Sequence, residues 1–366
     1  MASFFLFAIN LLRKRNLRLK QSLESPKEQV SQRRSRAEFR RANWSLVRDA
    51  LVDEVSKHDP FDAIHSHDII ALEAGALLKE RYGSKLIWDA HEIYESLGDV
   101  DASALSKNVI LENKNVIDSF ITINESIAGF YEQSHPELPT PAIVMNATLP
   151  SEPVKDDGRL RAAAELPEGS KIVLFQGGFA KHRGLEALVA AARDFDPPWF
   201  LVMMGWGHLE DKLRAAAEPI NEQARADGLP DRVVFLPGAP NSELKYWTAG
   251  ATLGAIPYEN ANLNHLYCTP NKLWEYPVAG VPFIATDLEE MSKMVKAYDT
   301  GFLIPRDFTA KSISDIVNAI TEEVLEQKRA ACARFSREHN WSRFEPRLLA
   351  VYETLGAEEE LLRAVT

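Results

Sequence analysis

The chain has 366 residues, of which 45% are hydrophobic and 26% are charged, with a formal net charge of −11. This length and composition are typical of a globular protein with two or three domains. The acidic balance disfavours a nucleic-acid-binding protein, because phosphate contacts need a basic face. The two cysteines, Cys268 and Cys332, form no disulfide framework or metal cluster and fit a reducing compartment such as the cytoplasm.

Residues 1–41 combine an apolar run, FFLFAINLL, with eleven Lys and Arg against three Glu. The run is too short to span a bilayer, and its basic residues follow it, unlike those of a secretory signal. An apolar run beside a basic segment predicts a peripheral contact at the inner face of a membrane. The alternative is a core strand covered by a solvated basic helix.

The first half of the chain alternates between helix-like and strand-like segments. Residues 17–57 are polar and charged, which predicts one or two long helices. Strands are then predicted at 61–67, 85–92, 116–124 and 141–147, with helices at 69–83 and 125–135. Strands separated by helices predict a parallel sheet in an α/β fold.

A Pro-rich and charged stretch at 148–170 marks a domain boundary. After it, strands are predicted at 171–178, 199–207, 232–238 and 251–258, with helices between them. The predicted organisation is therefore a Rossmann-like domain at 1–149, a second at 150–339, and a C-terminal amphipathic helix within 340–366.

Three segments of the second half lie where a strand ends and a helix begins: FQGGFAKHRG, MGWGHLE and TPNKLWE. Ligands of parallel α/β sheets bind at this edge, where helix N-termini present free N–H groups. Gly177 and Gly178 permit close approach to the backbone, and Arg183 adds positive charge. A single Gly-Gly turn is usually structural, but three such segments together predict an anion site.

The segment TPNKLWE adds polar groups to the same predicted site. Asn271 and Lys272 open the predicted helix, and Glu275 follows one turn later. A carboxylate in this position can accept hydrogen bonds from two hydroxyl groups, such as those of a ribose.

Several of these segments resemble family 4 glycosyltransferases, which are nucleotide-sugar enzymes of two Rossmann-like domains facing a cleft (the GT-B architecture). TPNKLWEYPVAGVPFIATD resembles the family's Pro-Asn-Lys-Leu-x-Glu-Tyr segment, and GGFAKHRGLEALVAAA resembles its phosphate loop. FDAIHSHD, KLIWDAHEIYES and NWSRFEPRLLAVYETL are similar to its other elements, so the resemblance covers about residues 60–360. The family's final helix implies that the C-terminal helix here returns to the first domain.

The resemblance implies transfer of a sugar from a nucleotide-diphosphate sugar to a glycan or lipid-linked acceptor, as in polysaccharide biosynthesis. It implies a retaining reaction with no metal and no cofactor beyond this co-substrate. Glu275 would bind the ribose, Arg183 and Lys272 the diphosphate, and His91 would line the cleft as the catalytic residue. Tyr267 and Gly178 depart from the family pattern, and no clear first strand precedes Asp62.

Two other functions stay open: a nucleotide-sugar epimerase, and an inactive sugar-nucleotide-binding partner subunit. A metal site of His65, His67 and His91 is a further alternative, because alternate positions on a strand share a face. A hydrogen-bonded structural role is favoured for His65 and His67. The acidic motifs at 99–101 and 194–196 are interpreted as loops.

Overall fold

The computed structural model describes residues 29–356, with side chains from residue 39 onward, and its chain divides into two compact units. Of the described residues, the first unit comprises 29–143 and 348–356, and the second comprises 144–347. The last helix, α15 (Trp341–Thr354), begins in the second unit and ends in the first. The expected return of the C-terminal helix to the first domain is therefore confirmed.

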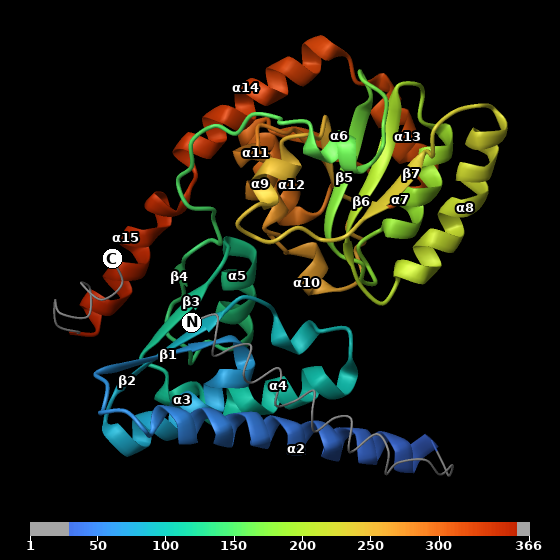
Figure 1. The fold of residues 1–366 in the computed structure, drawn as a ribbon. Coiled ribbons are helices and arrows are strands. Elements are labelled where there is room, and N and C mark those ends of the chain that lie inside the picture. The colour runs from blue at the N-terminus through green and yellow to red at the C-terminus, as the bar shows by residue number, and fades with distance from the viewer. Residues whose placement is uncertain (1–28, 357–366) are drawn as a thin grey trace. The chain divides into compact units, whose positions relative to one another are not determined.

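The first unit is built on a parallel sheet of order β1-β2-β3-β4. Figure 1 shows α2 running alongside α3 and α4, and α3 packs against β1 and β2 of this sheet. The strands are β1 (Ala63–His67), β2 (Lys85–Ala90), β3 (Ser119–Thr122) and β4 (Ala142–Ile143). The helices are α2 (Gln29–Val55), α3 (Asp68–Tyr82), η1 (Tyr94–Ser96), α4 (Val100–Asn113), η2 (Lys114–Val116) and α5 (Glu125–Ser134).

Local sequence explains where these helices begin and end. Helix α3 ends at Gly83, which has a left-handed φ of 73°. The N–H of Gly83 donates a hydrogen bond to the carbonyl of Lys79. The Asn124 side chain accepts a 2.9 Å hydrogen bond from the amide of Ile127 and so caps α5. The interpretation of residues 99–101 as a loop is wrong, because Asp99 caps α4 and the next two residues begin it.

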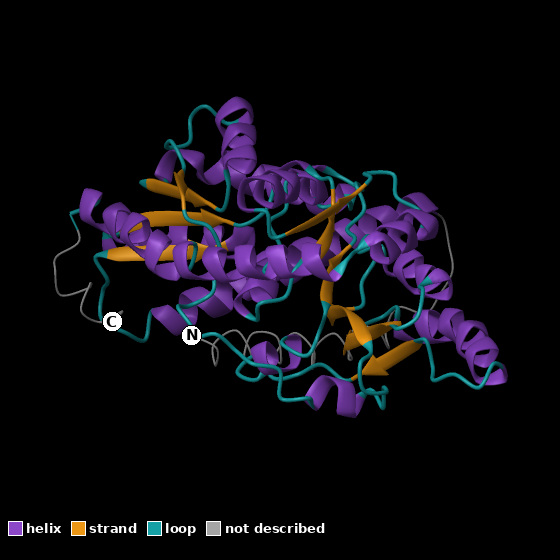
Figure 2. Cartoon of the chain, turned by 90° about the horizontal axis from the view of Figure 1, so that it is seen from above, coloured by secondary structure: helices purple, strands orange, loops and turns teal. Residues whose placement is uncertain are grey.

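The second unit holds a parallel sheet of order β10-β9-β8-β5-β6-β7. Figure 2 shows helices on both faces of the strands. The strands are β5 (Lys171–Gly178), β6 (Trp199–Trp206), β7 (Val233–Leu236), β8 (Leu253–Ile256), β9 (Phe283–Thr286) and β10 (Gly301–Ile304). The helices are α6 (Arg159–Ala163), α7 (Leu185–Ala191), η3 (Ala192–Asp194), α8 (Glu210–Ala226), α9 (Leu244–Thr248), α10 (Leu263–Leu266), α11 (Lys272–Val278), α12 (Glu289–Tyr298), α13 (Ala310–Ala319) and α14 (Glu322–Glu338).

Burial on both faces explains why the second sheet reads as continuous apolar runs. Along β5, Val173 and Phe175 join one core cluster, whereas Ile172 and Leu174 join the cluster on the opposite face. This alternation follows the two-residue period of a strand. Both faces of the sheet are therefore covered by packing, so a ligand can reach the sheet only at the ends of its strands.

Some predicted elements differ from those observed. Strand β4 has two residues where 141–147 were expected, and neither α4 nor β10 was predicted. The apolar run of residues 4–12 lies outside the described residues. Within residues 29–356, no helix combines the length and apolar character needed to cross a bilayer.

Candidate functional site

The order of the second sheet places a topological switch point between β5 and β8, where successive connections leave in opposite directions. Ligands of doubly wound sheets bind beside such a point, at the carboxyl ends of the strands. Strand β5 ends at Gly177 and Gly178, and β8 is followed by Pro257 and Tyr258. Residues from these two strand ends form the candidate site.

The two glycines let cationic side chains come close to the end of β5. Gly177 has a φ of 122°, and a Cβ on it would lie 3.1 Å from Lys272 Nζ. A Cβ on Gly178 would lie 3.6 Å from Arg183 Nη1. The structure thus brings together the two glycines and the two cations that the sequence singled out.

Lys272 is 8% exposed, which is unusual for an ammonium group. Its Nζ lies 3.5 Å from the hydroxyl of Tyr258 and over the ring of Phe175, 5.4 Å from the centroid. No carboxylate pairs with it among the described residues. A buried charge without a counter-ion is costly, so this arrangement suits a bound anion.

Arg183 is half-buried and, like Lys272, has no carboxylate partner in the described part of the chain. Its Nη1 donates a 3.2 Å hydrogen bond to the carbonyl of Gly178, and its guanidinium lies 5.5 Å from the Tyr258 ring centroid. The remaining guanidinium donors are available to a phosphate, which a planar fork can bind with two hydrogen bonds.

Glu275 is fixed by a short hydrogen-bond chain that the sequence analysis missed. Gln176 Nε2 donates to Glu275 Oε2 at 2.9 Å, and Gln176 Oε1 accepts from Thr248 Oγ1 at 2.7 Å. Gln176 is 2% exposed and directly follows the apolar run of residues 172–175 in β5. That isolated polar residue, immediately before Gly-Gly, was the signal available in the sequence.

Asn271 lies at the head of α11 but is exposed, and its side chain caps no backbone amide. Its carbonyl accepts a 2.9 Å hydrogen bond from the amide of Glu275. Asn271 thus contacts Glu275 through its backbone, and contact of its side chain with a ligand stays a prediction.

A second polar cluster lies in the first unit, at the carboxyl ends of β1 and β2. Asp89 Oδ2 accepts hydrogen bonds from His67 Nδ1 and His91 Nε2, both at 2.9 Å. His65 Nε2 lies 3.6 Å from the same oxygen, too far for a hydrogen bond. Asp68, beside them, has a φ of 62°, a strained conformation that recurs at functional sites.

The charges of this cluster follow from its contacts. Burial raises the pKa of Asp89, but the three surrounding imidazoles outweigh this effect and lower the pKa overall, so the carboxyl is ionised. Burial also lowers the pKa of His65, which is therefore neutral. For His91, burial is outweighed by Asp89 and Asp68, and the pKa is raised.

Ligand-type atoms of His65, His67 and Asp89 lie within 4.8 Å of one another, a spacing that permits a metal ion. The metal-site alternative considered from the sequence contains His91 in place of Asp89. The rings of His65 and His67 are stacked, with centroids 4.2 Å apart and planes 18° apart. Hydrogen bonds to Asp89 account for His67 and His91, and His65 Nδ1 contacts the hydroxyl of Tyr352, so we assign no metal to the cluster.

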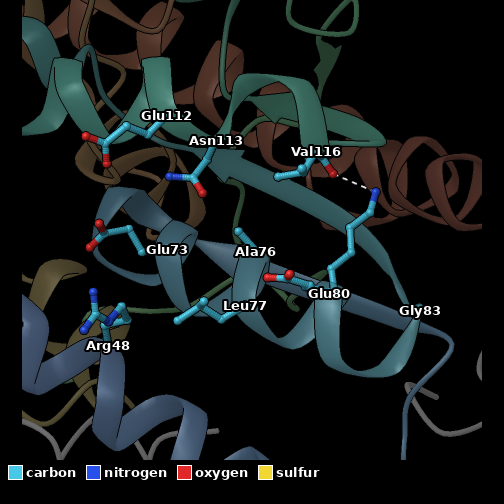
Figure 3. Close-up of a pocket in the computed structure, with 10 residues that line it drawn as sticks. Arg48, Glu73, Ala76, Leu77, Glu80, Gly83, Glu112, Asn113 and Val116 are labelled. Carbon is cyan, nitrogen blue, oxygen red and sulfur yellow. Dashed lines mark hydrogen bonds between the residues drawn. The ribbon is translucent and has the colours of Figure 1, made fainter.

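A cavity of about 610 Å³ opens elsewhere on the first unit, among α2, α3 and α4 (Figure 3). Its lining includes Gly83 and Val116, which precede β2 and β3, so it lies at the amino-terminal edge of the sheet. Its buried carboxylate, Glu73, already pairs with Arg41 at 3.1 Å. The cavity is thus separate from the His91 cluster.

The fold and the switch-point cations define a class: a two-unit α/β protein of the GT-B glycosyltransferase fold. The chain belongs to the family described as "Glycosyl transferases group 1", whose sequence model matches residues 156–339. The protein is therefore a glycosyltransferase, and the family resemblance noted in the sequence is confirmed.

Curated relatives include D-inositol 3-phosphate glycosyltransferases. The one from Nocardioides sp. is 22% identical over 329 residues, covering 81% of this chain and 68% of that protein. The one from Mycolicibacterium smegmatis is 25% identical over 315 residues, covering 81% of this chain and 68% of that protein.

Solved structures show the same fold at low sequence identity. Sucrose-phosphate synthase from Thermosynechococcus elongatus has a TM-score of 0.66 at 18% identity, covering 86% of this chain and 79% of that one. Anabaena HepE in complex with UDP-glucose has a TM-score of 0.63 at 16% identity, covering 86% of this chain and 82% of that one. These similarities confirm the predicted fold of two Rossmann-like domains.

Proposed function

We propose that the protein transfers a sugar from a nucleotide-diphosphate sugar to a glycan or lipid-linked acceptor, as in polysaccharide biosynthesis. The observation that carries this proposal is the pair Lys272 and Arg183 beside Gly177 and Gly178, with no carboxylate partner for either cation among the described residues. A diphosphate is the anion that two such cations and a glycine-lined strand end suit. The UDP-glucose complex of HepE supports a nucleotide-sugar donor.

The proposed reaction needs no metal ion and retains the anomeric configuration. Negative charge grows on the diphosphate as the glycosidic bond breaks, and cations already in place stabilise it. Lys272 and Arg183 supply two such charges, and Glu275 holds the ribose. His91 belongs to the acceptor-side domain and lies next to the transferred sugar in this proposal.

Turnover of a panel of UDP-, GDP-, ADP- and TDP-hexoses tests the proposal, with and without extracted membrane lipid as a source of acceptor. We expect release of nucleoside diphosphate from one donor class, stimulation by acceptor, and no loss of rate in EDTA. Proton NMR of the product should show the anomeric configuration of the donor. Binding of every donor without turnover would favour an inactive partner subunit, and loss of rate in EDTA would overturn the metal-free mechanism.

Contact with a membrane surface through residues 1–41 is part of the proposal. An apolar run with a basic segment forms a two-part anchor, and each basic residue near anionic lipid contributes about 1 kcal/mol. Most of this segment lies outside the described residues. At its end, Arg40 pairs with Asp99 and Arg41 with Glu73, so these two cations are engaged within the first unit.

Liposome co-sedimentation of the full chain tests the membrane contact. We expect binding that requires anionic lipid, falls at high salt, and is lost when the basic residues between 13 and 20 are replaced by glutamine. Equal recovery in the supernatant with anionic and neutral vesicles at low salt would contradict it.

A further inference from the structure

Asp89 fixes the hydrogen-bonding state of the His91 ring. An ionised carboxylate only accepts hydrogen bonds, so the 2.9 Å contact requires a proton on His91 Nε2. The other ring nitrogen, Nδ1, then carries the lone pair of the neutral ring. Nδ1 lies 3.9 Å from Asp68 Oδ1, and the side chain of His91 is 33% exposed. Because Asp89 occupies Nε2, Nδ1 is the ring nitrogen of His91 that is left to accept a hydrogen bond from a substrate.

A third imidazole, that of His65, also lies close to Asp89 Oδ2. The side chain of His65 is 14% exposed, lies against Asp89, and stacks on His67. His65 Nδ1 lies 2.7 Å from the hydroxyl of Tyr352, which comes from the part of α15 that belongs to the first unit. A continuous row of contacts thus runs from the C-terminal helix through His65 and Asp89 to His91.

We infer that Asp89 is a positioning residue for the transfer reaction: braced by His65 and Tyr352, it holds the His91 ring so that Nδ1 faces the substrate. This inference rests on the proposed function, in which His91 lies next to the transferred sugar. It also gives the C-terminal helix a part in the site, because Tyr352 completes the row of contacts.

Kinetics of matched variants of the full chain test the inference. Asp89→Ala removes the acceptor, so kcat should fall by about 10- to 100-fold while the KM for donor changes little, since the donor binds in the other unit. Asp89→Asn keeps an acceptor oxygen and should lose less. Tyr352→Phe removes one hydroxyl and should lower kcat by about two- to tenfold. Asp118→Asn is the control, because this carboxylate lies just before β3 in the same unit and pairs with Lys79 of α3, away from His91.

The pH profile separates positioning from a merely structural role. Removing the Asp89 charge disfavours the protonated ring of His91, so the midpoint belonging to His91 should move to lower pH in Asp89→Asn. The same midpoint should stay in place in Asp118→Asn. The charged and titratable groups around His91 are His65 and His67 from β1, Asp68 from α3, Asp89 from β2, Glu92 and Tyr94 after it, and Tyr352 from α15.

NMR of the resting protein gives a readout that does not depend on turnover. With ¹⁵N-labelled histidine, wild-type His91 should show a proton on Nε2 that Asp89→Asn weakens and Asp118→Asn leaves unchanged. If no donor is turned over, the proposed function fails while this signal still reports the contact. A wild-type midpoint and kcat in Asp89→Asn, or a His91 ring protonated on Nδ1 alone, would overturn the inference.

Discussion

Lys272 and Glu275 lie three residues apart in α11, yet their charged groups differ in burial and in hydrogen-bond partners. Glu275 is partly buried and is held by Gln176, whereas Lys272 is buried beside Gly177 without a carboxylate partner among the described residues. The protein positions the Glu275 carboxylate, whereas the Lys272 ammonium is free to pair with an anionic ligand. This difference allows the two roles to be tested separately.

Lys272→Met should weaken binding of a nucleoside diphosphate while leaving the ligand-free protein equally stable or more stable. Methionine has a similar length and removes a buried charge, whose burial disfavours folding by about 1–3 kcal/mol. Urea unfolding and calorimetry measure the two effects. Lys212→Met, at an exposed lysine paired with Glu186, is the control and should change neither quantity by much. Lower stability with unchanged binding would make Lys272 a structural residue.

Glu275→Ala should weaken nucleotide binding by about 1–3 kcal/mol, the range for hydrogen bonds to a charged group. The fold should survive, because Gln176 keeps its contact with Thr248. Calorimetry with a nucleotide checks the affinity, and Glu243→Ala, at an exposed carboxylate of the same unit, is the control. Unchanged affinity in Glu275→Ala would remove this residue from the site.

Gln176→Leu tests whether Gln176 acts through Glu275. Alone, it should cost about 0.5–1.5 kcal/mol of nucleotide affinity, since one hydrogen bond to the carboxylate is lost. In the Glu275→Ala background it should cost nothing further, because the group it positions is already absent. Additive losses in this double-mutant cycle would mean that Gln176 affects binding independently.

At the scale of elements, the site depends on β5 and β6 staying close at their carboxyl ends. A Cβ on Gly205 of β6 would lie 1.9 Å from the carbonyl oxygen of Gly177, which is impossible without movement. The missing Cβ of Gly205 therefore allows the two strands to approach closely where the anion site begins.

Gly205→Ala should destabilise the protein by about 1–3 kcal/mol, the usual cost of overpacking, and should also weaken nucleotide binding. Its control is Gly228→Ala, where φ is 72° but nothing lies within 4 Å of the added Cβ. The control should lose some stability through backbone strain and keep its nucleotide affinity. Equal affinity in both variants would show that strand spacing does not control the site.

Elements marked by a local pattern of residues could be predicted from the sequence. Elements and contacts that depend on residues distant in the sequence were missed. Strand β5 was predicted at its observed bounds because an apolar run ends in Gly-Gly. Helix α4 was missed because its charged and small residues resemble a loop until Asp99 caps it and Ser106, Val109 and Ile110 are buried. Asp89 was missed as the centre of the histidine cluster, because adjacency between β1 and β2 arises from strand pairing.

At the scale of the whole molecule, the candidate groups divide between the two units. The second unit supplies Lys272, Arg183 and Glu275 at one switch point, and the first supplies His91 with Asp89. The family match covers residues 156–339, which lie within the second unit. Donor binding is thus the property that this unit should carry, and the chemistry of the acceptor should depend on the first.

Calorimetric comparison of a nucleoside diphosphate with its parent nucleoside tests the central claim most directly. The wild-type protein should bind the diphosphate at least tenfold more tightly, because Lys272 and Arg183 meet its charge. In the variant carrying both Lys272→Met and Arg183→Ala, this preference should vanish while affinity for the nucleoside is retained. A double variant that still prefers the diphosphate by the wild-type factor would contradict the account.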